Sequence, residues 1–196
     1  MAWQSVVYTF KSSAPLIQHC GQTADPLSRY ARLLKQISGK RAKTDADYEE
    51  MARIEFYAGL YMNADGPILP NYMIDAMTVA AAKKLREGQM AKSGCFCLDH
   101  ARLEYDGPRT VEELWADERF HFSAIVRVQS ARVARMRPIF REWSATVTLH
   151  IEDTLVNPAR IDEWMAIAGT QIGLGDWRPQ YGRFSAERMR ELGEAT

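Results

Sequence analysis

The stretch that most constrains the fold is residues 144–190, which read SATVTLHIEDTLVNPARIDEWMAIAGTQIGLGDWRPQYGRFSAERMR. Apolar and polar residues alternate over 144–151, and this period of two predicts a half-buried strand. Asn157 and Pro158 are typical of a helix start. Apolar residues then recur at helical spacing until Gly173, where we expect the helix to end. A glycine-punctuated loop and a short closing strand complete the stretch.

The loop over residues 173–184 places three glycines among aromatic and arginine residues. Glycine lets another backbone or a ligand approach closely, and arginine and aromatic side chains suit phosphates and bases. We therefore take six residues of this loop as candidate nucleic-acid contacts: Gly173, Gly175, Gly182, Trp177, Arg178 and Arg183. The alternative is a loop that only closes a sheet, with Trp177 packed and Arg178 paired with an acid.

Composition limits the class of protein. The 196 residues suit one domain, or one domain with an insertion, and 46% hydrophobic with 26% charged residues indicates a globular chain. A formal net charge of +0 means that nucleic-acid contacts would depend on uneven placement of charge. Three cysteines, no secretory leader and no long apolar run predict free thiols in a cytoplasmic protein without a membrane partner. A bacterial or phage-infected host cell is the expected setting.

Charge is placed unevenly along the chain. Residues 127–141 contain five arginines and no acid, whereas residues 45–55 and 112–118 are acid-rich. If this run forms a strand and hairpin, three arginines share one side, and one lies on the other. These candidate phosphate ligands are Arg135, Arg137 and Arg141 on the first side and Arg132 on the second. The alternative is that they form ion pairs with the acid-rich segments or with a neighbouring subunit.

The remaining segments alternate between strand and helix signals. Strands are expected over 5–10, 14–17, 60–62, 67–69, 95–103 and 120–128. Helices are expected after Asp25-Pro26, over 45–58 behind a Thr44 cap, over 71–87 up to Gly88, and as one turn over 111–115. This order predicts an α+β fold, with a ferredoxin-like or RNA-recognition-like antiparallel sheet and helices on one face. We expect one domain over 1–196, with a helical insertion at 18–67 and a hairpin elaboration at 104–142.

The element order and the glycine loop together resemble the repeat-associated mysterious proteins, which supply RNA-binding backbone and handle subunits of CRISPR effector complexes. In that superfamily, a glycine-rich loop lies between the last helix and last strand, where residues 173–184 fall. The segment Gly66–Pro70 is also similar to the entrance of their first core helix. The resemblance implies RNA binding within a ribonucleoprotein, through Gly173, Gly175, Gly182 and Arg183. The intervening residues 176–179 depart from the family pattern, and the chain also resembles bacteriophage proteins of unassigned function.

Catalytic and metal-binding patterns are weak. His19 is the best candidate base for a metal-independent ribonuclease, but no partner is fixed by spacing, and a structural histidine is the favoured interpretation. Cys95, Cys97 and His100 suggest zinc, yet on a strand the histidine would point away from both cysteines. We therefore expect no catalytic residues, metal or cofactor.

The sequence leads to one functional hypothesis and two alternatives. The first is a non-enzymatic protein that binds single-stranded RNA or DNA, as a homo-oligomer arranged head-to-tail along the strand or as a ribonucleoprotein subunit. One alternative is a phage-type protein that uses the same fold to bind another protein. The other is the ribonuclease centred on His19.

Overall fold

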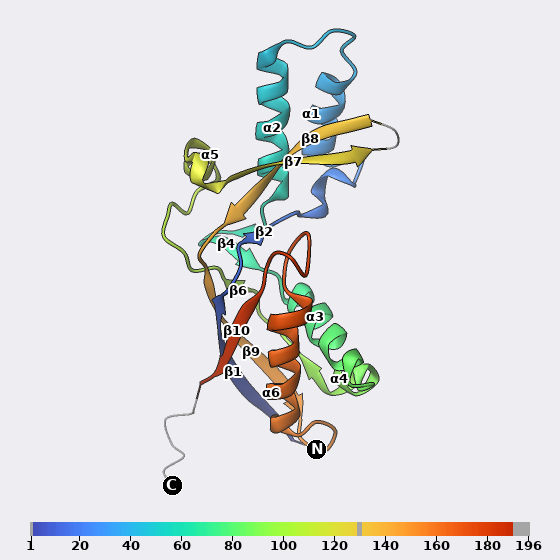
Figure 1. Ribbon diagram of the computed structural model, residues 1–196, viewed down its shortest axis with the longest axis vertical. Coiled ribbons are helices and arrows are strands. Elements are labelled where there is room, and N and C mark those ends of the chain that lie inside the picture. Colours follow the sequence, from blue (N-terminus) through green and yellow to red (C-terminus); the bar gives the residue numbers. More distant parts are fainter. Residues whose placement is uncertain (1, 129–130, 190–196) are drawn as a thin grey trace. The chain divides into compact units, whose positions relative to one another are not determined.

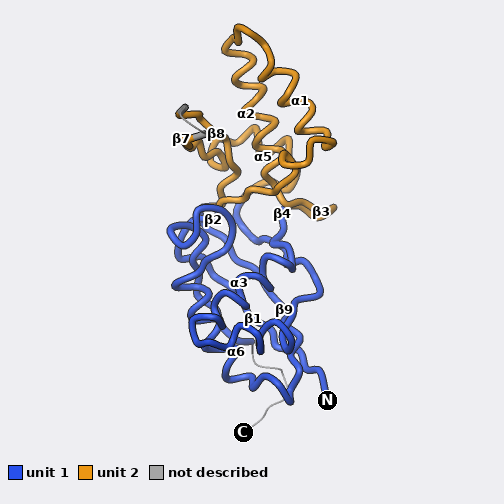
Figure 2. Tube along the Cα trace, turned by 90° about the vertical axis from the view of Figure 1, so that its right-hand side faces the viewer, with its two compact units in different colours: residues 1–16, 67–106, 141–196 blue, residues 17–66, 107–140 orange. Residues whose placement is uncertain are grey.

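The computed structural model describes residues 2–128 and 131–189. The chain divides into two compact units, each assembled from segments that are distant in the sequence (Figure 2). Unit 1 comprises residues 1–16, 67–106 and 141–196, and unit 2 comprises residues 17–66 and 107–140. The expected insertion at 18–67 and elaboration at 104–142 fall almost wholly within unit 2. The fold is mixed α+β with antiparallel sheets, as the sequence predicts.

Unit 1 is built on a four-stranded sheet with the order β10-β1-β9-β5, in which each neighbouring pair is antiparallel (Figure 1). The strands are β1 (Trp3–Ser12), β5 (Cys95–Phe96), β9 (Ser144–Glu152) and β10 (Phe184–Arg188). The strands predicted over 5–10 and 144–151 and the closing strand are therefore confirmed. Arg190, the last residue of the stretch quoted first, lies outside the described residues.

Helices cover one face of this sheet. They are α3 (Asn71–Lys84) and α6 (Pro158–Ile167), which pack against each other (Figure 1). Val6, Tyr8 and Phe10 of β1 are buried on this face, and the Tyr8 hydroxyl donates a hydrogen bond of 2.5 Å to Asp162 of α6. Burial and the Asp162 carboxylate raise the pKa of Tyr8. The buried face therefore points toward the helices.

The opposite face of the sheet is more exposed. Ser5 and Lys11 of β1 are exposed, and Val7 and Thr9 between them are half-buried. By the sheet register, Val7 pairs with Thr148, so small β-branched side chains lie side by side on this face.

The end of α3 differs from the prediction, because Gly88 does not terminate the helix over 71–87. α3 ends at Lys84, and a separate helix, α4 (Gly88–Gly94), begins at this glycine. The reason lies at Arg86, whose φ of 65° turns the chain and whose N–H bonds to the Lys83 carbonyl at 3.1 Å. The Glu87 N–H bonds to the Ala82 carbonyl at 2.9 Å, which completes a Schellman helix end.

The strand predicted over 95–103 is also wrong as a continuous element. Only β5 and β6 (Ala101–Arg102) form, and β6 pairs with β4 (Gly66–Leu69) rather than extending β5. The Cys97 N–H bonds to the Asp75 carboxylate at 2.8 Å, and the Asn71 amide bonds to the Leu98 carbonyl at 2.9 Å. These side-chain bonds from α3 replace the ladder that a longer strand would need.

Unit 2 combines two helices, a short helix and a hairpin. They are α1 (Arg29–Ser38), α2 (Asp45–Gly59), α5 (Val111–Ala116), β7 (His121–Val128) and β8 (Ala131–Phe140). Short strands β2 (Leu16–Ile17) and β3 (Met62–Asn63) flank the helices in the chain. Thr44 and Asp47 form the capping box of α2, which confirms the predicted start.

The start of α1 is wrong in the prediction. The Asp25 side chain accepts a bond from the Leu27 N–H and forms a turn, and Ser28 caps the helix by accepting from Ala31. Two short segments are 3₁₀ turns: Gly21–Thr23, which precedes α1, and Glu118–Phe120, which precedes β7. The Asp25-Pro26 signal therefore belongs to a turn that precedes the helix.

The core of unit 2 holds β8 against α2. A Cβ atom on Gly59 would lie 2.9 Å from Cδ of Pro138, so glycine permits the close approach of this helix end to the strand. Phe56 of α2 packs edge-on against Trp115 and His121, and Phe120 lies 5.7 Å from Phe140. This packing fixes which residues of β8 face α2.

Candidate nucleic-acid interface

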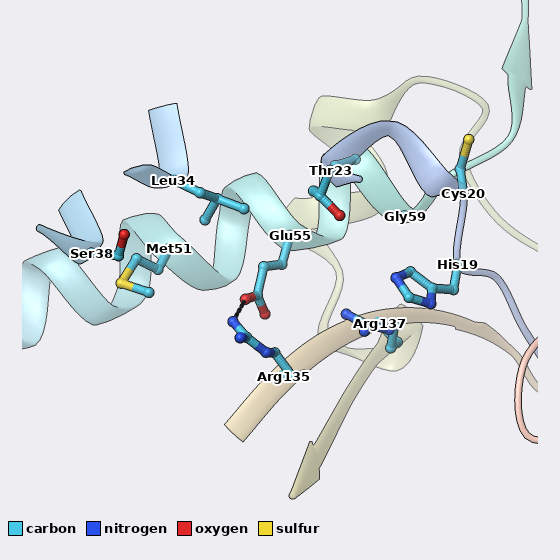
Figure 3. A pocket seen from close by; sticks show the side chains of 11 residues that line it. His19, Cys20, Thr23, Leu34, Ser38, Met51, Glu55, Gly59, Arg135 and Arg137 are labelled. Atoms are coloured by element: carbon cyan, nitrogen blue, oxygen red, sulfur yellow. Dashed lines mark hydrogen bonds and ion pairs between the residues drawn. The ribbon is translucent and has the colours of Figure 1, made fainter. Parts of the chain in front are cut away.

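Unit 2 has a cavity of about 320 Å³ between α2, β8 and the segment that follows β2 (Figure 3). Two of the predicted arginines line it, together with the histidine that sequence reasoning singled out as a base. The lining residues are His19, Cys20, Thr23, Leu34, Ser38, Met51, Glu55, Ala58, Gly59, Arg135 and Arg137. The structure thus brings Arg135 and Arg137 together on one face of the hairpin.

Glu55 of α2 neutralises one of these arginines. Its side chain is only 7% exposed, and one carboxylate oxygen accepts a hydrogen bond from Arg135 Nη1. The other oxygen accepts from the Met136 backbone N–H at 2.9 Å. Both oxygens of Glu55 are therefore engaged, and Arg135 is tied to α2 in the way that the ion-pair alternative predicts.

Arg137 and His19 form the other end of the cavity (Figure 3). Arg137 Nη1 donates to the Met136 carbonyl at 3.0 Å, and His19 is exposed. General acid–base cleavage needs two groups that exchange protons with the substrate. Both Glu55 oxygens already accept hydrogen bonds, so this carboxylate is engaged with β8.

Arg132 occupies the opposite face of the hairpin. It lies directly across from Arg127 in the β7–β8 register, whereas Arg135 lies across from Ala124. Arg132 is exposed and makes no ion pair with any residue of the described chain. It is therefore a cation at the surface of unit 2, separate from the cavity.

The glycine loop belongs to unit 1 and folds back on itself. The Leu174 N–H bonds to the Gly182 carbonyl at 2.9 Å, and the Gly182 N–H bonds to the Pro15 carbonyl at 2.7 Å. Gly182 has a φ of 70°, and a Cβ atom there would lie 1.8 Å from the Leu174 carbonyl oxygen. Gly173 and Gly175 also have positive φ, at 75° each. These glycines serve the internal packing of the loop, as the sheet-closing alternative predicts.

The side chains of the loop are nevertheless at the surface. Trp177 is 40% exposed, with its ring 6.1 Å from that of Tyr181. Arg178 and Arg183 are exposed and have no ion-pair partner among residues 2–128 and 131–189. Arg141, which follows β8, is exposed and also belongs to unit 1. Of the predicted cations, three therefore belong to each unit: Arg132, Arg135 and Arg137 in unit 2, and Arg141, Arg178 and Arg183 in unit 1.

The open sheet face carries an aromatic row that the sequence analysis missed. The Trp3 ring lies 4.8 Å from that of Phe96, and the Phe96 ring stacks on His150 at 5.6 Å with 25° between the planes. Trp3 is 51% exposed, and His150 also contacts the Ser5 hydroxyl at 3.2 Å. Because these rings come from β1, β5 and β9, only the strand pairing reveals their adjacency.

The cysteines and histidines form no metal centre in the described part of the chain. Burial raises the pKa of the Cys95 and Cys97 thiols to about 12, with a further contribution from the Asp75 carboxylate. His100 instead accepts from the Asn71 N–H at 3.1 Å. Among residues 2–128 and 131–189, no group of three or more His, Cys, Asp or Glu side chains is arranged to hold a metal ion.

Neither a protein-family model nor a curated protein matches this chain. The described residues contain no helix with the length and hydrophobicity that a bilayer span requires.

Proposed function

We propose that this protein binds single-stranded RNA or DNA, without cleaving it, on the open sheet face of unit 1. The observation that carries the proposal is the aromatic row of Trp3, Phe96 and His150. Aromatic rings on an exposed surface stack on unpaired bases, and each stacked base contributes about 1–3 kcal/mol. Half of the Trp3 surface is available for such a contact.

The strand order supports a ferredoxin-like, RNA-recognition-like arrangement for unit 1. β1 and β5 are both antiparallel to β9, and β9 and β10 are both antiparallel to β1. The chain between β1 and β5 includes α3, and the chain between β9 and β10 includes α6. Two interleaved split βαβ units of this kind define the ferredoxin-like layout, whose free face receives single-stranded nucleic acid in RNA-recognition domains.

This layout is also the basis for proposing a relationship to the repeat-associated mysterious proteins, with the glycine loop between α6 and β10. Within that proposal, Arg178 and Arg183 of unit 1 supply phosphate contacts, because they are exposed and lack acidic partners in the described chain. Arg132 is a separate candidate phosphate contact, on the surface of unit 2. Arg135 of unit 2 is a weaker candidate phosphate ligand than Arg132, because Glu55 neutralises it. The cytoplasm of a bacterium or an infected host cell is the proposed setting, and assembly along the strand is the proposed mode.

The test is fluorescence anisotropy with labelled oligouridylate and oligothymidylate at about 50 and 200 mM salt. Trp3→Ala is expected to weaken binding by about 5- to 150-fold, which corresponds to the loss of one stacked base. Tyr48→Ala is the matched control, since Tyr48 is an aromatic residue of α2 with 59% exposure. Equal affinity of Trp3→Ala and wild type, or no binding to either oligonucleotide at the lower salt, would refute the proposal.

The same binding assay separates phosphate contacts from base contacts. Arg178→Ala and Arg183→Ala are each expected to lower the slope of log K against log salt by about one, which stacking variants leave unchanged. Incubated RNA that is cut by wild type but not by His19→Ala would instead support the ribonuclease. Size-exclusion chromatography with light scattering, with and without oligonucleotide, reports the proposed assembly.

A further inference from the structure

Unit 1 has a second cavity, of about 340 Å³, at the corner between α3 and α4. Three cations line it and no acid does. The lining residues are Val79, Lys83, Arg86, Gly88, Gln89 and Lys92. None of the three rings of the aromatic row lines this cavity, so the proposed function does not account for it.

The cations of this corner have no counter-charge within the described chain. Lys83, Arg86 and Lys92 are exposed, and none of them makes an ion pair with a described residue. The nearest acid in the sequence is Glu87, whose carboxylate accepts hydrogen bonds from Arg160 and from Trp164 Nε1, the latter at 2.8 Å. Glu87 is thus committed to α6, and the three positive charges around the cavity are left without an acid.

Arg86 occupies a backbone position at which glycine is usual. Arg86 has a φ of 65° at the position after the helix end that glycine most often occupies. An L-residue in this conformation is less stable than glycine. Arg86 nevertheless occupies the position, and its side chain lines the cavity. Strained residues of this kind cluster at functional sites.

Gly88 positions a second cation. A Cβ atom on Gly88 would lie 2.4 Å from Cγ of Lys83, so any larger residue would displace the lysine stem. The stem therefore lies directly over the start of α4, and Lys83 lines the same cavity as Lys92 one turn further on. The absence of a side chain at Gly88 therefore helps to position a cation of this corner.

We infer that this corner is an anion-binding site for a phosphate-bearing ligand. Arginine and lysine are the side chains that bind phosphate most strongly, and a ligand with two or more negative charges matches three unpaired cations. The site is independent of stacking on the open face. It therefore stands or falls separately from the proposed function.

The test is isothermal titration calorimetry with inorganic pyrophosphate at low ionic strength. Wild type is expected to bind, and a variant that combines Lys83→Gln, Arg86→Gln and Lys92→Gln is expected to bind at least about tenfold more weakly. Lys84→Gln is the matched control, because Lys84 is the adjacent exposed cation of α3 but does not line the cavity. Unchanged affinity in the triple variant, equal loss in Lys84→Gln, or no binding by wild type would overturn the inference.

A second variant tests the geometry without removing charge. Gly88→Ala retains every cation but displaces the Lys83 stem, so weaker pyrophosphate binding is expected, with circular dichroism to verify the fold. Wild-type affinity in a folded Gly88→Ala protein would contradict the positioning that the inference requires.

Two sources of phosphate are distinguished by competition. If the ligand is a strand end, a 5′-phosphorylated oligonucleotide binds more tightly than its 5′-hydroxyl form, and pyrophosphate removes the difference. If it is a free nucleotide, ADP competes with pyrophosphate, and both oligonucleotides bind equally. Either result upholds the anion site, whereas failure of both ADP and the phosphorylated oligonucleotide to displace pyrophosphate overturns the phosphate-ester assignment. Retention of pyrophosphate binding in Trp3→Ala separates this site from the open face.

Discussion

The cations of the two cavities differ in whether the chain itself supplies their counter-charge. In unit 2, Glu55 pairs with Arg135, which lies 80 positions away in the sequence, and neutralises it. In unit 1, the acid nearest in sequence to Arg86 and Lys83 is Glu87, which pairs with Arg160 instead. Both clusters place several cations close together in the sequence. A run of cations therefore points to an external anion only where the fold commits the neighbouring acids elsewhere.

The largest expected difference between the units concerns their thiols. Cys20 lines the open cavity of unit 2, whereas Cys95 and Cys97 are buried in unit 1, where their pKa is raised to about 12. Because the thiolate is the reactive form, Ellman's reagent at neutral pH should label one thiol rapidly and two at least about 100-fold more slowly. Cys20→Ser should abolish the rapid phase. Equal labelling rates for all three thiols would contradict this difference between the units.

The same thiols give a pH dependence of stability. Their folded-state pKa of about 12 lies above the usual value of 9.0, so the folded protein retains these protons longer than the unfolded chain. The contribution of these protonated thiols to the free energy of unfolding is complete below about pH 9. It is lost as the pH rises toward about 12. Unfolding in urea at increasing alkaline pH measures this loss, which a Cys95→Ala, Cys97→Ala variant should reduce.

The next effect tests the internal ion pair of unit 2. Glu55→Ala should lower the free energy of unfolding by about 2–3 kcal/mol, because it leaves Arg135 and the Met136 N–H without their acceptor. Glu187→Ala is the control, since the Lys11–Glu187 pair of unit 1 has exposures of 58% and 62% and should contribute less than about 1 kcal/mol. Equal losses of unfolding free energy for the two variants in urea titrations would contradict a larger stabilising role for Glu55.

The smallest effect has the opposite sign. Arg86→Gly should raise the free energy of unfolding by about 1 kcal/mol, because glycine adopts the φ of 65° without strain. The same change should weaken pyrophosphate binding. Thermal unfolding of this variant measures its stability, and titration calorimetry measures its affinity for pyrophosphate. A variant that loses stability would show that the Arg86 side chain is a structural contact.

Local signals predicted much of the fold. The alternation over 144–151 and the caps at Thr44 and Asn157 were confirmed, because each depends on residues only a few positions apart. The end of α3 was wrong, because it depends on Arg86 adopting a conformation that favours glycine. Sequence periodicity gives no sign of such a choice.

The candidate site was less accessible to sequence reasoning. Arg135 and Arg137 were correctly assigned to one side of a hairpin, but the acid that pairs with Arg135 lies in a distant helix. The row of Trp3, Phe96 and His150 requires three strands to be paired in the correct order. One of these strands has only two residues, too few for a periodic pattern.

The topology of unit 1 also has a consequence for folding during synthesis. β1 pairs only with β9 and β10 in its sheet, and both of these follow unit 2 in the chain. All segments of unit 2 leave the ribosome before the partners of β1 do. Unit 2 can thus form its native contacts first. β1 stays unpaired until strands that lie more than 130 residues later are synthesised. Its alternating apolar side chains are a natural target for chaperones during that interval.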